Sequence, residues 1–177
     1  MLRKRPKISI YIAASIDGYI ARKDGSLDWL DRVGDPEEDY GFQKMLSSID
    51  GVILGRKTYE IAAPVADWPY KGKKLIVLSQ SLKTVREGAE LFQGDLTQLV
   101  SQLHNEGIRH IWIDGGETIA QFLKLQMVDH MTISVIPILL GDGIPLFHPL
   151  AKELPCRLIS SDSYPSGLVQ LCYEIKF

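Results

Sequence analysis

The residues whose types and spacing point most directly to chemistry are Gly115 and Gly116. They follow the apolar run Ile111–Ile113, which predicts a buried strand, and Thr118 then opens a helical pattern of apolar residues. A strand that ends on two glycines and continues as a helix leaves N–H groups unpaired at the helix N-terminus, where they and the dipole suit phosphate oxygens. Glycine also lets a ligand approach without a Cβ in the way, although the same pair would serve equally well as a tight turn.

Two adjacent cations, Arg56 and Lys57, follow Gly55 after the short strand predicted over Gly51–Leu54. They could clamp a terminal phosphate, and Ser79 and Gln80, which follow the next strand, could add hydrogen bonds to it. A 2′-phosphate needs such a pocket, whereas a bare ribose favours an acidic partner, and no Asp or Glu stands beside Arg56 or Ser79. The pattern therefore favours NADP over NAD; the alternative is that these cations are solvated surface charges.

The elements that would position these groups alternate between strands and helices. Strands are predicted over 8–14, 51–54, 74–78, 111–113 and 130–136, helices from 35, 59, 96 and 118, and a hairpin over 158–177. This order predicts an α/β fold over 1–177 as a single domain, with a mostly parallel central sheet, flanking helices and an antiparallel C-terminal hairpin. Ligands of such sheets bind beyond the carboxyl ends of the strands. Those ends are the long loop Ser15–Trp29, Gly55–Thr58, Ser79–Ser81 and Asp114–Thr118.

The helix predicted after the first long loop has a recognisable start. Asp35 is expected to be its N-cap, Pro36 its first residue and Glu38 the partner of a capping box. Phe42 and the apolar residues that follow it to Ile49 would form the buried face of this helix.

Composition excludes several classes of protein. The chain has 177 residues and a formal net charge of −2, with charges spread along it, which disfavours nucleic acid and anionic membranes as partners. Cys156 and Cys172 are expected to be buried thiols in a reducing cytosol. The basic residues before Ile8–Ala14 imitate a short signal peptide, but polar residues interrupt the apolar part, so a cytoplasmic location is expected. No apolar run is long enough for a membrane helix.

Familiar phosphate-binding and metal-binding motifs are missing. Gly51–Thr58 looks a little like a Walker A loop, but three residues instead of four separate its glycines and Arg56 intrudes before the lysine. There is no Rossmann GxGxxG, and the histidines show no metal-ligand spacing, so no metal is expected.

Five segments taken together resemble the dihydrofolate reductase-like superfamily, in the branch of the riboflavin-biosynthesis reductase, the RibD C-terminal domain. They are Ile12–Ala21, Val52–Glu60, Leu75–Ser79, Ile113–Glu117 and Pro137–Phe147, and they span nearly the whole chain in family order. The resemblance implies a three-layer fold and NADPH as hydride donor. It also implies that the peptide between the paired glycines is cis, as is frequent in this superfamily.

The resemblance also implies roles for individual residues. Ala13 and Ile20 would line the nicotinamide end of the coenzyme. The adenosine ribose phosphate would be held by Arg56, Lys57, Thr58, Ser79, Gln80 and Ser81, and the pyrophosphate by Gly115, Gly116, Glu117 and Thr118.

Two carboxylates compete for the role of proton donor, which hydride addition to a C=N or C=O bond requires. Asp39 stands thirteen residues before Val52, where similar dihydrofolate reductases keep their substrate-binding carboxylate, although it could simply stabilise the first turn of a helix. Asp114 ends a strand beside the glycines, where burial would raise its pKa, although it could merely stabilise the turn. Trp29 and Phe42 are candidates to sandwich a flat heterocycle, with core packing as the alternative.

The sequence thus predicts an NADPH-dependent reductase of a pyrimidine- or pterin-like small molecule. The alternatives are a folate reductase and a protein that binds NADP without catalysis. The residues that hold a phosphoribosyl group in riboflavin-pathway reductases cannot be placed in this chain, so the cofactor half of the resemblance transfers better than the substrate half. A homodimer is expected from the resemblance alone.

Overall fold

The computed structural model describes residues 5–66 and 69–177. Its strands are β1 (Lys7–Ser15), β2 (Tyr19–Ala21), β3 (Gly51–Gly55), β4 (Lys74–Leu78), β5 (Ala89–Phe92), β6 (His110–Asp114), β7 (His130–Ile136), β8 (Ile144–Pro145), β9 (Cys156–Ser163) and β10 (Val169–Ile175). Its helices are the 3-10 helix η1 (Asp28–Val33), α1 (Phe42–Ser48), α2 (Arg56–Ala62), α3 (Leu96–Asn105) and α4 (Gly116–Lys124).

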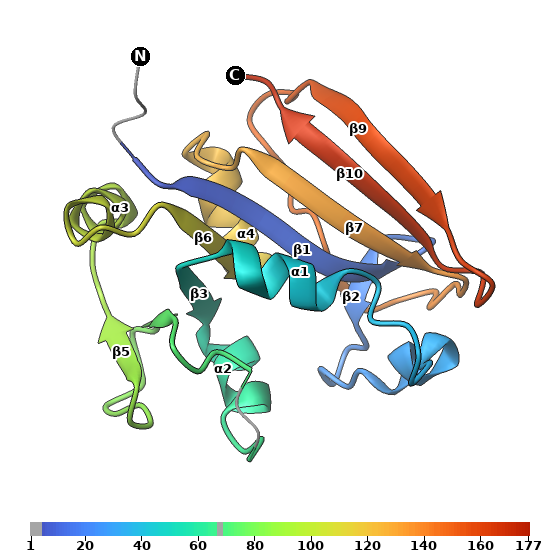
Figure 1. Ribbon diagram of the computed structural model, residues 1–177, viewed down its shortest axis with the longest axis horizontal. Helices are drawn as coiled ribbons and strands as arrows, with labels where there is room; N and C mark the ends of the chain where they lie inside the picture. The colour runs from blue at the N-terminus through green and yellow to red at the C-terminus, as the bar shows by residue number, and fades with distance from the viewer. Residues whose placement is uncertain (1–4, 67–68) are drawn as a thin grey trace.

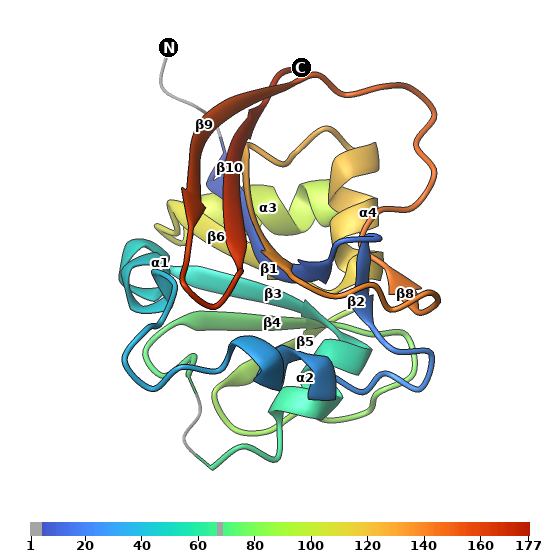
Figure 2. The same cartoon turned by 90° about the vertical axis from the view of Figure 1, so that its right-hand side faces the viewer.

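One eight-stranded sheet runs through the molecule in the order β5-β4-β3-β6-β1-β7-β10-β9 (Figure 1). The first six of these strands pair in parallel, and β10 pairs antiparallel with both β7 and β9. The sequence prediction of a mostly parallel sheet with an antiparallel C-terminal hairpin is therefore confirmed. A separate pair, β2 with β8, lies beside the carboxyl end of β1 (Figure 2).

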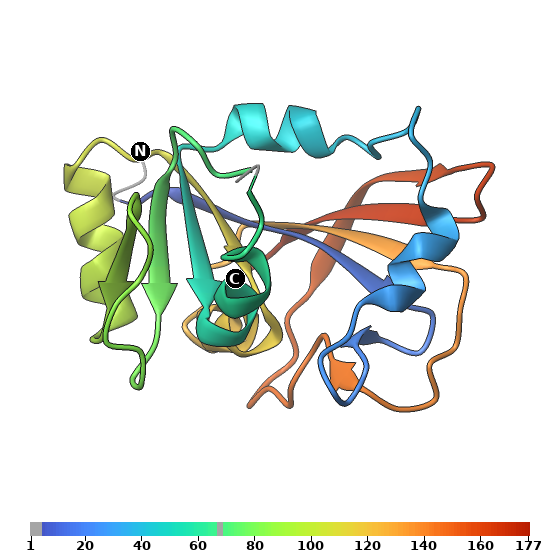
Figure 3. The ribbon, with the colours of Figure 1, turned by 90° about the horizontal axis from the view of Figure 1, so that it is seen from below.

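Helices cover both faces of the parallel part of the sheet and make three layers (Figure 3). On one face, apolar residues of α3 and α4 pack on alternate strand residues such as Ile8 and Ile113. On the other face, α1 and α2 cover a second cluster that includes Val52, Leu54 and Trp112. Successive strand residues point to opposite faces, so β3, β4 and β6, which have consecutive buried residues, are buried on both sides, as their continuous apolar runs predict. No helix among the described residues has the length and apolar character to cross a bilayer.

The start predicted for the first helix, at Asp35, is wrong. Helix α1 begins only at Phe42, because Tyr40 and Gly41 adopt positive φ angles of 54° and 85°, which a right-handed helix cannot contain. Asp35 instead closes a turn, in which its side chain accepts a hydrogen bond from the Glu37 N–H at 2.9 Å. The capping signal at Asp35 is a local one, and the left-handed residues that follow override it.

Other differences are smaller. The stretch predicted as one long loop, Ser15–Trp29, contains the short strand β2, and strands β5 and β8 were not predicted. Helix α4 begins at Gly116 instead of Thr118, and α2 at Arg56. The cysteines were predicted to be buried, but Cys156 is exposed and Cys172 half-buried, because Cys156 begins the edge strand β9 and Cys172 lies on the strand next to it.

Candidate active site

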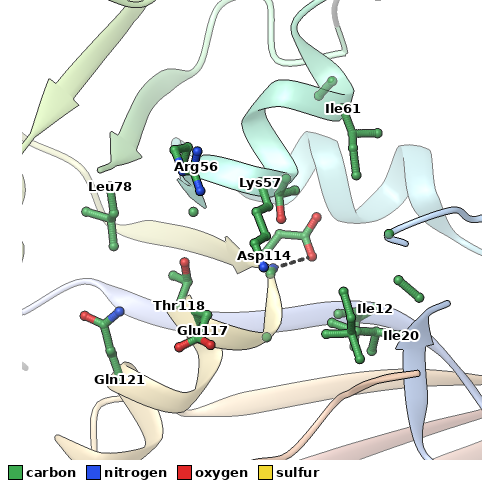
Figure 4. A pocket seen from close by; sticks show the side chains of 18 of the residues that line it. Ile12, Ile20, Arg56, Lys57, Ile61, Leu78, Asp114, Glu117, Thr118 and Gln121 are labelled. Carbon is green, nitrogen blue, oxygen red and sulfur yellow. Dashed lines mark hydrogen bonds between the residues drawn. The ribbon is translucent and has the colours of Figure 1, made fainter. Parts of the chain in front are cut away.

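A pocket of about 820 Å³ opens at the carboxyl ends of the parallel strands (Figure 4). It lies where β1, β3, β4 and β6 end and where α2 and α4 begin, which is the position that open α/β sheets use for ligands. The structure brings fifteen of the seventeen residues predicted for the site to this one pocket. They are Ala13, Ile20, Phe42, Gly55, Arg56, Lys57, Thr58, Ser79, Gln80, Ser81, Asp114, Gly115, Gly116, Glu117 and Thr118.

Two glycines of the pocket allow two loops to touch. A Cβ on Gly115 would stand 2.6 Å from Oγ1 of Thr58, and a Cβ on Gly55 would stand 2.9 Å from Oγ1 of Thr118. Gly115 also has a φ of 96°, which favours glycine. These glycines therefore serve the packing of the β3–α2 loop against the β6–α4 loop, a role that their neighbours in the sequence do not reveal. The peptide expected to be cis is trans, since no described peptide bond is cis.

His148 is a pocket residue that the sequence prediction missed. Its Nε2 atom is buried, has no hydrogen-bond partner among the described residues and lies 3.7 Å from the Cβ position of Gly116. The spacing of the histidines in the sequence tests only for a metal site. No pattern between neighbouring residues places residue 148 beside residue 116. The contact arises because the chain passes back over the start of α4 after β8.

The cationic side of the pocket lies at the first turn of α2. Arg56 and Lys57 are exposed, and the only ion pair of Arg56 among the described residues is a long one of 3.5 Å to Glu60. An exposed pair of this kind contributes little, so the guanidinium is available to an anionic ligand. At the end of the neighbouring strand β4, the Ser79 hydroxyl accepts hydrogen bonds from the N–H groups of Ser81 and Leu82 at 3.2 and 3.0 Å, which holds this loop in a fixed turn.

Asp114 is one of two carboxylates among the described residues that line the pocket, with Glu117, and it is the one whose pKa burial raises. It lies at the end of β6, and its Oδ1 accepts a hydrogen bond from the Gly115 N–H at 2.8 Å (Figure 4). Burial raises the pKa of this carboxyl group from 3.8 to about 6, although the hydrogen bond acts in the opposite direction. A carboxyl with such a pKa can hold a proton near neutral pH, as a general acid must.

The rival carboxylate, Asp39, lies outside the pocket lining. Its two oxygens accept hydrogen bonds from the N–H groups of Gly41 and Gln43 at 2.8 and 3.0 Å, at the start of α1. These hydrogen bonds lower the pKa of Asp39, and the side chain is exposed. Of the two interpretations of Asp39, these hydrogen bonds favour a carboxylate that stabilises the start of a helix, although Asp39 lies two residues before the N-cap Gly41 and not in the first turn.

Trp29 is also separated from the pocket. Its side chain is 1% exposed and packs in a core cluster with Val33, Ile136 and Leu168. The expectation that Trp29 would stack on a ligand therefore gives way to core packing, because η1 turns its indole toward β7. Phe42 does line the pocket, with its ring 6.0 Å from that of Tyr11 and 6.1 Å from that of Trp112.

Comparison with known proteins agrees with this architecture. The RibD C-terminal domain model matches residues 6–170. The uncharacterized protein YwjB of Bacillus subtilis is 40% identical over 179 residues, which covers 94% of this chain and 97% of YwjB. A provisionally named riboflavin biosynthesis protein from Shewanella sp. PV-4 has a crystal structure that superposes with a TM-score of 0.90 at 38% identity, covering 97% of this chain and 99% of that one.

A more distant structure shares the fold only. It is a diaminohydroxyphosphoribosylaminopyrimidine deaminase/5-amino-6-(5-phosphoribosylamino)uracil reductase from Thermotoga maritima. It has a TM-score of 0.75 at 14% identity, and the match covers 98% of this chain and 57% of that one. With a family model that extends over residues 6–170 and full-length relatives at about 40% identity, the chain belongs to the RibD C-terminal domain family of reductase-like proteins.

Proposed function

We propose that this protein is an NADPH-dependent reductase that transfers a hydride to a pyrimidine- or pterin-like heterocycle. The single observation that carries the proposal is the convergence of Arg56, Lys57 and the start of α4 on one pocket that also contains Asp114. A phosphorylated dinucleotide needs several cations and hydrogen-bond donors along one groove to bind its phosphate groups. A reduction also needs an acid beside the atom that is protonated when the hydride arrives.

The donor set fits this coenzyme. The exposed guanidinium of Arg56 and the hydroxyl groups of Ser79 and Ser81 suit a 2′-phosphate, and no described acidic residue of the pocket lies in their loops to favour a bare ribose. The N–H groups at the start of α4 suit a pyrophosphate, and the buried, unpartnered Nε2 of His148 lies beside them. When bound, the coenzyme would supply the hydride.

The other groups would act on the substrate side of the pocket. Asp114 would hold a proton for the substrate atom that becomes more basic as the neighbouring carbon is reduced. Ile12, Ile20 and Ile61 give this side an apolar wall that excludes water from the reacting centre (Figure 4). The β1–β2 turn that precedes Ile20 is held by Asp17, whose carboxylate accepts hydrogen bonds from the N–H groups of Leu140 and Gly141 at 3.1 and 2.7 Å.

The proposal is tested by titrating the purified protein with NADPH and with NADH, followed by NADPH oxidation assays with dihydropterins, dihydrofolate and aminouracils. We expect saturable NADPH binding that is tighter than NADH binding, and turnover with at least one of these heterocycles. Turnover with dihydrofolate alone would identify the alternative, a folate reductase. NADPH binding without any turnover would favour a coenzyme-binding protein, and a lack of NADPH binding would overturn the proposal.

A further inference from the structure

One end of the pocket is an aromatic chamber, formed by Tyr11, Phe42, Ile61, Tyr70 and Trp112 around Asp114. The rings form a continuous chain, with centroid distances of 6.0 Å from Tyr11 to Phe42, 6.1 Å from Phe42 to Trp112 and 5.8 Å from Trp112 to Tyr70. Trp112 and Asp114 are two residues apart on β6, so both side chains point to the same face of the sheet. The chamber thus offers flat apolar walls and one carboxyl group.

None of the described residues that form the chamber is a lysine or an arginine. Arg56 and Lys57, the pocket's two lysine or arginine side chains, begin α2, and the proposed function assigns both to the coenzyme. The segment of residues 22–30, which runs from the end of β2 into η1, contributes only Gly25, Leu27 and Leu30 to the pocket lining. The two cations of this segment form ion pairs with other residues: Arg22 pairs with Asp28, and Lys23 pairs with Asp142.

The hydrogen-bonding groups of the chamber are few and specific. The hydroxyl of Tyr11 already donates to the Tyr40 carbonyl at 2.8 Å, so it is directed away from a ligand. Trp112 is 5% exposed, and its Nε1 is buried without an acceptor among the described residues. Asp114 can accept hydrogen bonds from amino or ring N–H groups, and a ring carbonyl would give the indole N–H an acceptor.

We propose that the aromatic chamber takes an uncharged aminopyrimidine or pterin ring whose substituents carry no phosphate. This inference rests on the proposed function and narrows its substrate class. A phosphate dianion would lose water beside a carboxylate, with no lysine or arginine among the described chamber residues to compensate, whereas a flat neutral ring can stack on the walls. The substrate thus differs from the phosphoribosylated uracil in the name of the Thermotoga maritima enzyme.

The decisive comparison uses two ligands that differ only in the phosphate: 5-amino-6-ribosylaminouracil and its 5′-phosphate. Both are titrated calorimetrically into protein saturated with NADP⁺, in which no hydride can be transferred. We expect the phosphate-free compound to bind about tenfold more tightly, or better. Equal or tighter binding of the phosphate would overturn the inference, as would no binding of either. The preceding NADP⁺ titration shows separately whether the coenzyme site, and with it the proposed function, has failed.

A matched pair of variants tests the cause of the preference. Ile61 is 52% exposed, so Ile61→Arg adds a cation at the rim without filling the core, and Ile61→Gln changes polarity alone. We expect Ile61→Arg to reduce the preference for the phosphate-free ligand about tenfold, and Ile61→Gln to leave the ratio of the two affinities unchanged. An unchanged ratio in Ile61→Arg, with folding verified by circular dichroism, would show that missing positive charge does not set the specificity.

Discussion

Oγ1 of Thr58 stands 2.6 Å from the point where a Cβ of Gly115 would lie, so these two residues determine how closely the β3–α2 and β6–α4 loops can approach. The loops carry the cations and the helix N-terminus of the proposed coenzyme site. Their spacing is therefore a structural requirement of the site itself, and it can be tested at a single contact.

We expect Gly115→Ala to lower the free energy of unfolding by about 1–3 kcal/mol, because the new methyl group meets Thr58 and the backbone φ of 96° disfavours alanine. Adding Thr58→Ala to this variant should restore the part of the lost unfolding free energy that is due to the contact. The part that is due to the φ angle should remain lost. Urea unfolding of the two single variants and the double variant measures this coupling. Strictly additive losses would show that the contact carries no energy.

Arg56 is the residue through which the coenzyme phosphate should be recognised. We expect Arg56→Ala to weaken NADPH binding by about ten- to a hundredfold and NADH binding much less, because a charge-assisted hydrogen bond to the extra phosphate is lost. The NADPH affinity of Arg56→Lys should lie between those of the wild type and Arg56→Ala, since lysine keeps the charge without the guanidinium fork. Fluorescence titration of both coenzymes measures the effect, and equal weakening of both would contradict the assignment.

The raised pKa of Asp114 predicts a pH dependence of stability. Below pH 4 the carboxyl is neutral in both states, and between about pH 4 and about pH 6 the unfolded chain releases the proton while the folded chain keeps it. Wild-type stability should therefore fall relative to Asp114→Asn across this window, by about 1–3 kcal/mol, and stay parallel to it above. Urea unfolding from pH 3.5 to 7.5 tests this; parallel curves throughout would contradict the raised pKa.

Turnover should distinguish the two carboxylates that the sequence left open. We expect Asp114→Asn to lower turnover by about a hundredfold or more, because it removes the acid beside the reacting centre. Asp39→Asn should stay within about twofold, because asparagine also stabilises the start of a helix and the side chain lies outside the pocket lining. Steady-state assays with a heterocycle that the turnover screen identifies as a substrate, alongside NADPH affinities, make the comparison. A large loss in Asp39→Asn alone would reverse the roles.

The sequence predicted five of the six parallel strands, all but β5, and the loops at the carboxyl ends of β1, β3, β4 and β6, because both depend on local signals. Apolar runs such as Ile111–Ile113 predict buried strands wherever they occur, and the glycines and cations that follow them mark the ends. It could not decide between Asp39 and Asp114. Both end or precede apolar segments, and only burial, which depends on distant neighbours, separates the pKa of one from that of the other.

The sequence by itself determined five of the six parallel strands, the polar and glycine residues at the ends of β3, β4 and β6, and the resemblance to the family. Tertiary structure alone decided which aromatic ring faces the pocket: Trp112 and not Trp29. It also decided that His148 meets Gly116. The physical reason is that periodicity and turn chemistry act between near neighbours, whereas the surroundings of a side chain are set by elements far away in the sequence.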